Sequence, residues 1–433
     1  MKRHESLFVI LTLAIGFVIR ILFVLNSPQA LSGDEAAYHS ISERFLSTGT
    51  LLNSQGTPTA FRPPAYFLFL SFVLALSNHS ILMVKITQVV LSLLTALVIF
   101  QIARKFLGHS VSLIALLLSI LYMPFIWLPT RLYSETLFLF FFTIAFYYFA
   151  KLWSRLTFPD VVKCGVFIGI AALTRGVAIV MLFLFLFSLG IKYYSKRILP
   201  FKKVTFLLLM GFFSFSLIIS PWVVRNYHLL GVPKFTTEAG MVWYTSYFPK
   251  SGKIFSAIPR EDPAIQQAYA IPTELEREEF LMSQTFSKLK QNPWRIIQLI
   301  PMKFVSLWSP IHWEIYHTAV YDWSYVALWP FFFLGFFWLY RYKRDVLFPM
   351  AVPLIGIIAI SLVFYGSGRL RFPGEPCFVL IASCAFDQAF QKRSILLNFM
   401  ILLWVMIHFY LSFYYMEVKS FLKYLAIQAG IWL

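Results

Sequence analysis

Long apolar runs alternate with short polar breaks along almost the whole chain. A helix of about 20 apolar residues crosses the ~30 Å hydrocarbon core of a bilayer, where only helices and closed barrels satisfy their backbone hydrogen bonds. The pattern therefore predicts an all-α fold, a polytopic transmembrane helical bundle of about eleven spans that forms a single membrane domain over residues 1–433. The predicted spans are 7–25, 81–103, 110–128, 133–152, 161–174, 176–194, 203–223, 323–340, 346–365, 374–390 and 394–415.

Composition agrees with a membrane protein. Of the residues, 59% are hydrophobic and 13% are charged, about half the charged fraction of a soluble chain. The net charge of +18 would suit nucleic acid, but the basic residues lie between apolar runs instead of along one stripe, so no nucleic-acid partner is expected. No disulfide framework or zinc spacing is present, because all three cysteines fall inside apolar runs. The first run lacks a small-residue cleavage site, which predicts a retained span instead of a signal peptide.

The basic residues orient the bundle. With the N-terminus in the cytoplasm, the inner loops collect Lys and Arg, as the positive-inside rule requires. Only Glu5, Asp160, Asp345 and Asp387 are acids on that side. The inner basic segments are Lys2/Arg3, Arg104/Lys105, Lys151/Arg155/Lys163, Lys192 to Lys203, Arg341/Lys343/Arg344 and Lys392/Arg393.

The first outer segment, 26–80, contains two predicted juxtamembrane helices. Residues 34–48 form one of them. Pro63–Ser77 is apolar but too short for a confident span, so we interpret it as a helix lying in the outer leaflet. Counting it as a span would move Arg104 and Lys105 to the outer side, against the charge rule.

The second outer segment, 224–322, is long and partly interfacial. Thr273 with Glu276 three residues later is a capping-box pattern, which predicts a helix from Glu274 to about Gln291. Because several of its apolar residues fall near one face, we expect this helix to rest on the membrane surface. Those residues are Leu275, Met282, Phe286 and Leu289.

Charged residues gather at the outer membrane boundary. Taken alone, Asp34 would cap a short helix and Glu35 would lie in its first turn. Glu135 occupies the same depth at the outer end of the fourth span. A single arginine there could merely extend toward lipid headgroups, but several together on the disfavoured side need partners or a function. Arginine binds phosphate bidentately, so the group predicts a site for a lipid-linked phosphate. The arginines are Arg62, Arg175, Arg225, Arg369 and Arg371.

Short motifs, in order along most of the chain, resemble the membrane glycosyltransferases of superfamily C, in the branch of protein O-mannosyltransferases and lipid A aminoarabinose transferases. Each motif is weak alone, and their shared order, spacing and membrane side carry the resemblance. They are Asp34-Glu35-x-x-Tyr38, Arg62-Pro63-Pro64-x-Tyr66, Tyr133-Ser134-Glu135-Thr136-Leu137, Leu173-Thr174-Arg175, Pro221-Trp222-x-x-Arg225-Asn226, Asn292-Pro293, Lys303-Phe304-x-x-Leu307-Trp308-Ser309-Pro310 and Arg369-x-Arg371-Phe372-Pro373-x-x-Pro376.

The resemblance implies a glycosyltransferase that moves a sugar, with inversion, from a polyprenyl-phosphate donor to an acceptor hydroxyl. The reaction would take place on the periplasmic or extracytoplasmic side of the cytoplasmic (inner) membrane. Asp34 matches the family's catalytic base, Glu135 a second family acid, and Arg62 a basic residue that holds the donor phosphate. Arg371 fits a donor or phosphate role, and Arg225 and Lys303 are added as phosphate ligands on charge. Lys303 could instead be a membrane anchor among Trp294, Trp308 and Trp313. Candidate substrate-binding residues are Glu35, Tyr38, Arg175 and Arg369.

The chemistry is coherent with these residues. An acceptor hydroxyl must lose its proton, which one carboxylate can remove. Polyprenyl phosphate leaves readily without a paired acid, but its negative charge needs stabilisation. The residues establish no certain cofactor. Asp34 and Glu35 could hold a divalent metal ion, although no complete ligand set is present in the sequence.

Two other functions remain open at this point. A transporter or flippase of a lipid-linked or anionic solute would also need spans and buried charge, of which Arg20 is the clearest case. Transporters place their binding groups near the bilayer midplane and show internal repeats, whereas here the charges gather at one surface. A non-catalytic assembly protein on the same scaffold is the second. The sequence leaves open the sugar and the acceptor, whether lipid, polysaccharide or protein.

Overall fold

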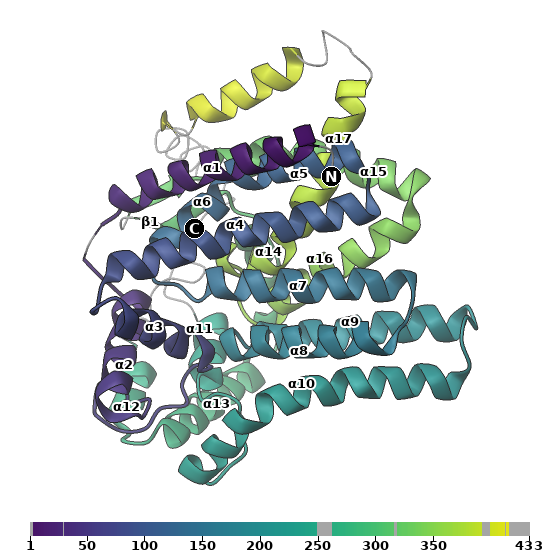
Figure 1. Ribbon diagram of the computed structural model, residues 1–433. Helices are drawn as coiled ribbons and strands as arrows, with labels where there is room; N and C mark the ends of the chain where they lie inside the picture. The colour runs from purple at the N-terminus through teal and green to yellow at the C-terminus, as the bar shows by residue number, and fades with distance from the viewer. Residues whose placement is uncertain are drawn as a thin grey trace.

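The computed structural model describes residues 3–28, 30–248, 262–315, 318–391, 399–411 and 413–414. Its long helices lie side by side across Figure 1. The elements are α1 (Arg3–Leu25), α2 (Asp34–Thr48), α3 (Ala65–Leu76), α4 (Ile81–Phe106), α5 (His109–Leu121), α6 (Met123–Trp127), η1 (Leu128–Thr130), α7 (Glu135–Ser154), α8 (Phe158–Thr174), α9 (Val177–Ser195), α10 (Phe201–Leu230), α11 (Ala239–Tyr247), α12 (Pro263–Ala270), α13 (Glu274–Gln291), α14 (Trp294–Leu307), β1 (Ile311–Ile315), β2 (Thr318–Tyr321), α15 (Trp323–Tyr342), α16 (Arg344–Val363), η2 (Gly368–Gly374) and α17 (Glu375–Gln391).

The predicted membrane bundle is confirmed. Within the described residues, seven helices are long and apolar enough to cross a membrane, namely α1, α4, α7, α9, α10, α15 and α16, and α5 with α6 passes the same test as a bent pair. α8 and α17 have 17 residues each and occupy two further predicted spans. The last predicted span, 394–415, lies partly outside the described residues, where Phe399–Leu411 is an apolar helix. The chain is therefore a helical, multi-pass membrane protein, and its described residues include a short antiparallel hairpin, β1–β2.

Two kinds of apolar face explain the packing. α1 exposes more than half of Leu11, Ile15 and Leu22. This exposure suits contact with lipid tails, because large apolar side chains in a water-soluble protein are mostly buried. α7 buries a stripe of phenylalanines along one side, and Phe149 stacks on Phe185 of α9 with ring centroids 4.0 Å apart. α7 is thus a central helix, and its first residue, Glu135, lies at a fixed position at one end of the bundle.

The third predicted span, 110–128, is broken instead of continuous. The chain bends by 56° between α5 and the α6–η1 segment, where Pro124 at the start of α6 cannot donate a backbone hydrogen bond. The fully buried Arg20 donates to the carbonyls of Ser119 and Ile120 at this break, at 3.2 Å each, and to Ser92. Arg20 therefore satisfies the end of α5, which accounts for its mid-span charge without a transported ligand.

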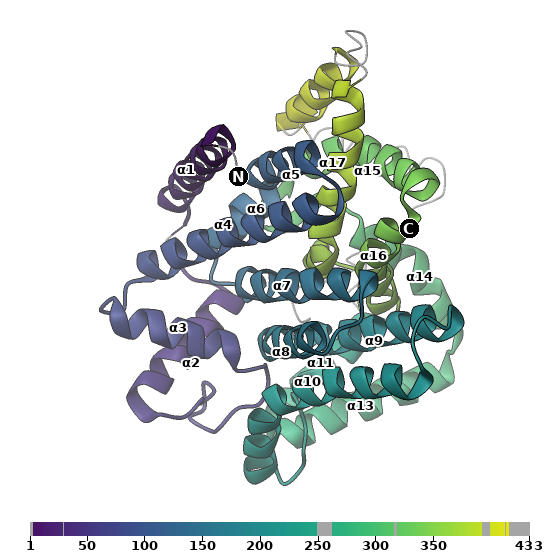
Figure 2. The ribbon, with the colours of Figure 1, turned by 45° about the vertical axis from the view of Figure 1, so that its right-hand side comes forward.

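The juxtamembrane helices gather at one end of the bundle. α2 and α3 pack together there, at the left in Figure 1 and at the lower left in Figure 2. The short apolar segment is confirmed as the separate helix α3. α10 runs to Leu230, past the predicted end at 223, because Pro221 is accommodated within it, so Arg225 lies on the helix and does not end it.

The helix predicted from the capping box is confirmed. α13 runs from Glu274 to Gln291, and Thr273 accepts a hydrogen bond from the backbone N–H of Glu276. Leu281 packs on Tyr244 of α11, whereas Phe286 on the neighbouring face is exposed, so contact of that face with the membrane surface stays a prediction. The buried face of α13, which packs against α11, consists of Glu278, Leu281, Thr285 and Leu289.

The membrane side of this end is open to a direct test. Gln55 is exposed in the loop after α2, and Lys196 is exposed at the opposite end of the bundle. We expect a cysteine replacing Gln55 to react with an impermeant maleimide on intact cells and one replacing Lys196 to react only after permeabilisation. The native cysteines are buried and will not compete. The reverse pattern would invert the orientation.

Candidate active site

Asp34 is the first residue of α2. Gly33, just before it, has a φ of +54°, a conformation that favours glycine, and it turns the chain into the helix. The expected capping role of Asp34 is wrong, because Gly33 occupies the N-cap position and the Asp34 carboxylate binds two arginines instead. The side chain of Asp34 therefore points toward the bundle, away from its own helix end.

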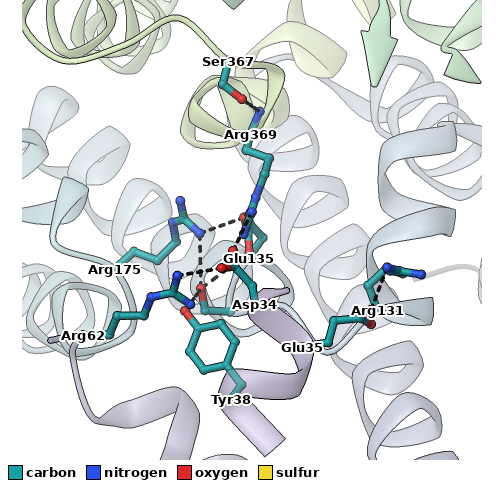
Figure 3. Close-up of polar contacts among 10 residues, drawn as sticks. Asp34, Glu35, Tyr38, Arg62, Arg131, Glu135, Arg175, Ser367 and Arg369 are labelled. Carbon is teal, nitrogen blue, oxygen red and sulfur yellow. Dashed lines mark hydrogen bonds and ion pairs between the residues drawn. The ribbon is translucent and has the colours of Figure 1, made fainter. Parts of the chain in front are cut away.

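Five charged side chains form an arginine–carboxylate cluster, drawn in Figure 3. Arg62 donates from Nη2 to Asp34 Oδ1 at 2.7 Å, and Arg369 donates from Nη1 to Asp34 Oδ2 at 2.8 Å. Arg369 also donates from Nε to Glu135 Oε1 at 2.5 Å. Arg175 Nη1 lies 2.7 Å from the same Glu135 oxygen. The cluster thus joins residues from four distant segments around Arg369, which bridges both acids.

Aromatic rings and hydroxyls hold the cluster in place. Arg369 lies over the ring of Tyr133 at 4.4 Å, and Arg62 lies over the ring of Tyr38 at 4.8 Å. Ser134 accepts hydrogen bonds from the Tyr38 hydroxyl at 3.3 Å and from Arg175 at 3.2 Å. Of the residues predicted to bind substrate, Tyr38 therefore contacts the cluster and Arg175 belongs to it.

The two carboxylates differ in access. The side chain of Asp34 is 30% exposed, whereas that of Glu135 is 0% exposed. Only Asp34 can meet an acceptor without rearrangement. Burial raises the pKa of Asp34, but the charges of Arg62 and Arg369 outweigh burial and hold that pKa well below its ordinary value. Asp34 is therefore ionised in this state and a weak base.

Glu35 faces away from the cluster, as Figure 3 shows. Its carboxylate accepts from the backbone N–H of Leu132 at 3.0 Å and lies 2.6 Å from Arg131. Burial raises the pKa of Glu35, although both contacts oppose that effect. This arrangement attaches the start of α2, where Asp34 lies, to the loop before α7, and the predicted role of Glu35 in substrate binding stays a prediction.

A segment before α3 positions Arg62. Glu274 of α13 accepts hydrogen bonds from the Thr59 hydroxyl at 2.6 Å and the Ala60 N–H at 3.0 Å. Arg225 donates to the Thr59 carbonyl at 2.7 Å. Arg62 Nη1 and Arg225 Nη2 are both buried and have no acceptor in the described structure. Buried donors of this kind are costly unless a ligand or water binds them.

The other two predicted phosphate ligands lie outside the cluster. Arg371 is buried, donates to Glu375 at 2.5 Å and to the Ser309 carbonyl at 3.1 Å, and lies over the ring of Tyr325. Lys303 donates to the carbonyl of Leu362 at 3.2 Å. Burial lowers the pKa of Lys303 to about 8. The structure shows both in contacts that join elements of the fold.

Known proteins place this geometry in context. Residues 61–224 match the family model of dolichyl-phosphate-mannose-protein mannosyltransferases. No curated protein matches the sequence. The structure resembles ArnT from Cupriavidus metallidurans bound to undecaprenyl phosphate, with a TM-score of 0.57, 15% identity, and coverage of 88% of this chain and 60% of ArnT. It also resembles the oligosaccharyltransferase AglB from Archaeoglobus fulgidus in complex with an inhibitory peptide and a dolichol-phosphate, with a TM-score of 0.58, 14% identity and coverage of 97% and 56%.

A third structure, an Archaeoglobus fulgidus oligosaccharyltransferase in complex with zinc and sulfate, gives a TM-score of 0.55 at 14% identity, with coverage of 92% and 51%. The fold is that of the superfamily C membrane glycosyltransferases. The resemblance inferred from the motifs is thereby confirmed at the level of the fold. The chain spans only between about half and three-fifths of the length of the three proteins.

The matched segment and the cluster overlap in part. Residues 61–224 include Arg62, Glu135 and Arg175, whereas Asp34 and Arg369 lie outside them. The family match therefore includes three of the five residues of the cluster, and the structure alone adds the other two. Among the described residues, no group of three or more His, Cys, Asp or Glu side chains could hold a metal ion. Both acids of the cluster contact arginines, so the side chains around them do not form a cation site.

Sequence reasoning missed several partners. Arg131 binds Glu35, Glu274 fixes the Arg62 segment, and Glu375 pairs with Arg371. A four-residue spacing on a helical segment would have suggested the last pair. The first two join residues that are far apart in the sequence, and no local pattern points to them.

Proposed function

We propose that this superfamily C chain transfers a sugar from a polyprenyl-phosphate donor to an acceptor hydroxyl, with inversion, on the non-cytoplasmic face of the cytoplasmic membrane. One observation carries the proposal: a partly exposed, ionised carboxylate, Asp34, lies beside Arg62, whose Nη1 is buried without an acceptor. A base for a hydroxyl and a donor set for a phosphate are thus adjacent on a fold that resembles ArnT bound to undecaprenyl phosphate.

The reaction assigns a role to each group. The acceptor oxygen attacks the anomeric carbon while its proton moves to Asp34. The bond between the anomeric carbon and the phosphate oxygen breaks, and the polyprenyl phosphate leaves with the electron pair. Arg62 and Arg225 would bind the developing negative charge through their free N–H groups. Glu135 is fully buried, so it holds Arg369 and Arg175 in place and does not contact the acceptor.

The substrate classes follow from the same reasoning. The donor is a polyprenyl phosphate carrying a hexose or pentose, and the acceptor is a lipid, polysaccharide or protein hydroxyl in cell-envelope glycosylation. The match of residues 61–224 to the mannosyltransferase family model and the similarity to ArnT and AglB support a lipid-phosphate donor more than they support any one acceptor. Arg175 and Arg369 remain candidate substrate-binding residues beside the acids.

Binding of the released lipid tests the phosphate assignment. We expect undecaprenyl or dolichyl phosphate to bind the protein in nanodiscs, and Arg62→Gln and Arg225→Gln to weaken binding by about tenfold or more each, because each removes a charge-assisted hydrogen bond. Arg44→Gln is the matched control, since Arg44 donates to the carbonyls of Leu52 and Asn53 in the same loop. Equal affinity in all four proteins, measured by native mass spectrometry, would contradict the assignment.

A further inference from the structure

In the donor-free structure, two arginines of the cluster bind the predicted base, Asp34. Asp34 Oδ1 accepts from Arg62 at 2.7 Å and Oδ2 accepts from Arg369 at 2.8 Å, so each carboxylate oxygen already has a guanidinium partner. A carboxylate held by two cations is a poor proton acceptor. An acceptor hydroxyl that arrived at this state would meet a base that is both blocked and weak.

The two arginines are not equivalent. Arg369 has a fixed place: it bridges Asp34 and Glu135, lies over Tyr133, and comes from the short segment η2. Among the described residues Arg62 forms an ion pair with Asp34, and its Nη1 is buried without an acceptor. The guanidinium of Arg62 therefore has N–H groups left to donate, and two of them could bind a phosphate.

We propose that Arg62 exchanges Asp34 for the phosphate of the bound donor, and that this exchange frees Asp34 Oδ1 to accept the proton of the acceptor hydroxyl. The inference rests on the proposed function. Arg369 stays on Oδ2 as a positioning residue that keeps the carboxylate aligned with Glu135. Binding of the donor thereby activates the base that deprotonates the acceptor.

The exchange has a kinetic consequence. Before the donor binds, Arg62 balances Asp34; afterwards it balances the phosphate, and no charge is left unpaired in a partly buried site. The acceptor is activated only when the donor is already in place, which gives an ordered reaction. Proton removal from the acceptor in the absence of donor is prevented by the same contact.

The ionisation of Asp34 reports the exchange directly. Losing one nearby cation raises a carboxyl pKa by about 1 to 3 pH units. Other charged and titratable groups surround Asp34, and of these Glu238 and Tyr38 also interact with Arg62. The surrounding groups are Tyr38 from α2, Arg369 from η2, Glu135 from α7, Arg175 before α9, Glu238 before α11, and Tyr365 after α16.

The experiment follows reaction of Asp34 with a water-soluble carbodiimide, which modifies protonated carboxyl groups, between pH 3 and 7. Protein in nanodiscs is measured by peptide mass spectrometry with and without undecaprenyl phosphate or dolichyl phosphate, and lipid binding is measured separately by native mass spectrometry. The readout is the pH of half-labelling at Asp34, which uniform shielding by a bound lipid would not move.

We expect the half-labelling pH of the wild type to lie below the measured range without lipid, because Arg62 and Arg369 hold the pKa of Asp34 well below its ordinary value, and to move up into that range with lipid, a rise of about 1 to 3 pH units. Arg62→Gln should show the raised value without lipid and no further rise with it, whereas Arg44→Gln should behave as the wild type. Arg369→Gln should still respond to the lipid, because Arg62 remains. Lipid that binds without moving the half-labelling pH would overturn the exchange and leave the proposed function intact. If neither lipid binds, the proposed donor class fails, and the exchange fails with it.

Discussion

Replacing Asp34 with Asn is expected to lower the rate of sugar transfer by about a hundredfold to ten-thousandfold, the range that a positioned general base contributes. The amide keeps the size of the side chain but cannot accept the hydroxyl proton. Folding should survive, because α2 remains attached through Glu35 to Leu132 and Arg131. The transfer rate and the thermal unfolding of the purified variant are compared with those of the wild type.

The matched control lies on the same helix. Glu43 has a side chain that is 29% exposed, close to the 30% of Asp34, and it pairs with His79 away from the cluster. Glu43→Gln makes the same change from carboxylate to amide and should leave transfer within about twofold of the wild type, as surface ion pairs contribute little. Equal losses in both variants would mean that Asp34 acts through the charge or stability of α2, and not as the base.

The second large effect is on stability. Glu375→Leu should lower the free energy of unfolding by about 3–5 kcal/mol, because it leaves Arg371 buried without its carboxylate. The double variant Arg371→Met/Glu375→Leu should recover most of that loss, since a buried pair and apolar residues of similar volume have similar stability. Thermal or denaturant unfolding of the two variants in detergent measures the difference.

The same variants separate two roles for Arg371. If it joins η2 to α17, as its contacts with Glu375 and the Ser309 carbonyl indicate, the double variant keeps its affinity for polyprenyl phosphate. If Arg371 binds donor phosphate, as the motif resemblance implied, the double variant is stable but loses affinity. Tyr122, which also donates to Glu375, is left unpaired in both variants and does not bias the comparison.

The sequence predicted the spans and the local signals well. Apolar runs located the helices because lipid-facing and core-facing residues are both apolar, and the capping box located α13 to the residue. The break between α5 and α6 was missed because the run itself is continuous, and only the distant Arg20 satisfies the freed carbonyls. The packing of α13 on α11 was not foreseen, because no local pattern identifies the partner helix.

The sequence identified the residues of the site better than it identified which of them pair. The excess of arginines at one boundary identified Arg62, Arg175 and Arg369 as candidates, and the structure brings all three to Asp34 or Glu135. Which arginine meets which acid depends on how α2, η2 and α7 pack. Lys303 and Arg371 carry the same positive charge as these arginines, and only tertiary contacts distinguish them from the cluster.

The central claim is tested most directly by donor consumption. Purified wild type and Asp34→Asn are incubated in lipid with a panel of polyprenyl-phosphate sugars and an acceptor-containing membrane extract, and the remaining donors are quantified by mass spectrometry. We predict that wild type consumes one donor and releases its polyprenyl phosphate, while the variant consumes none. Consumption by both proteins would contradict Asp34 as base, and consumption of no donor by the wild type would contradict glycosyl transfer itself.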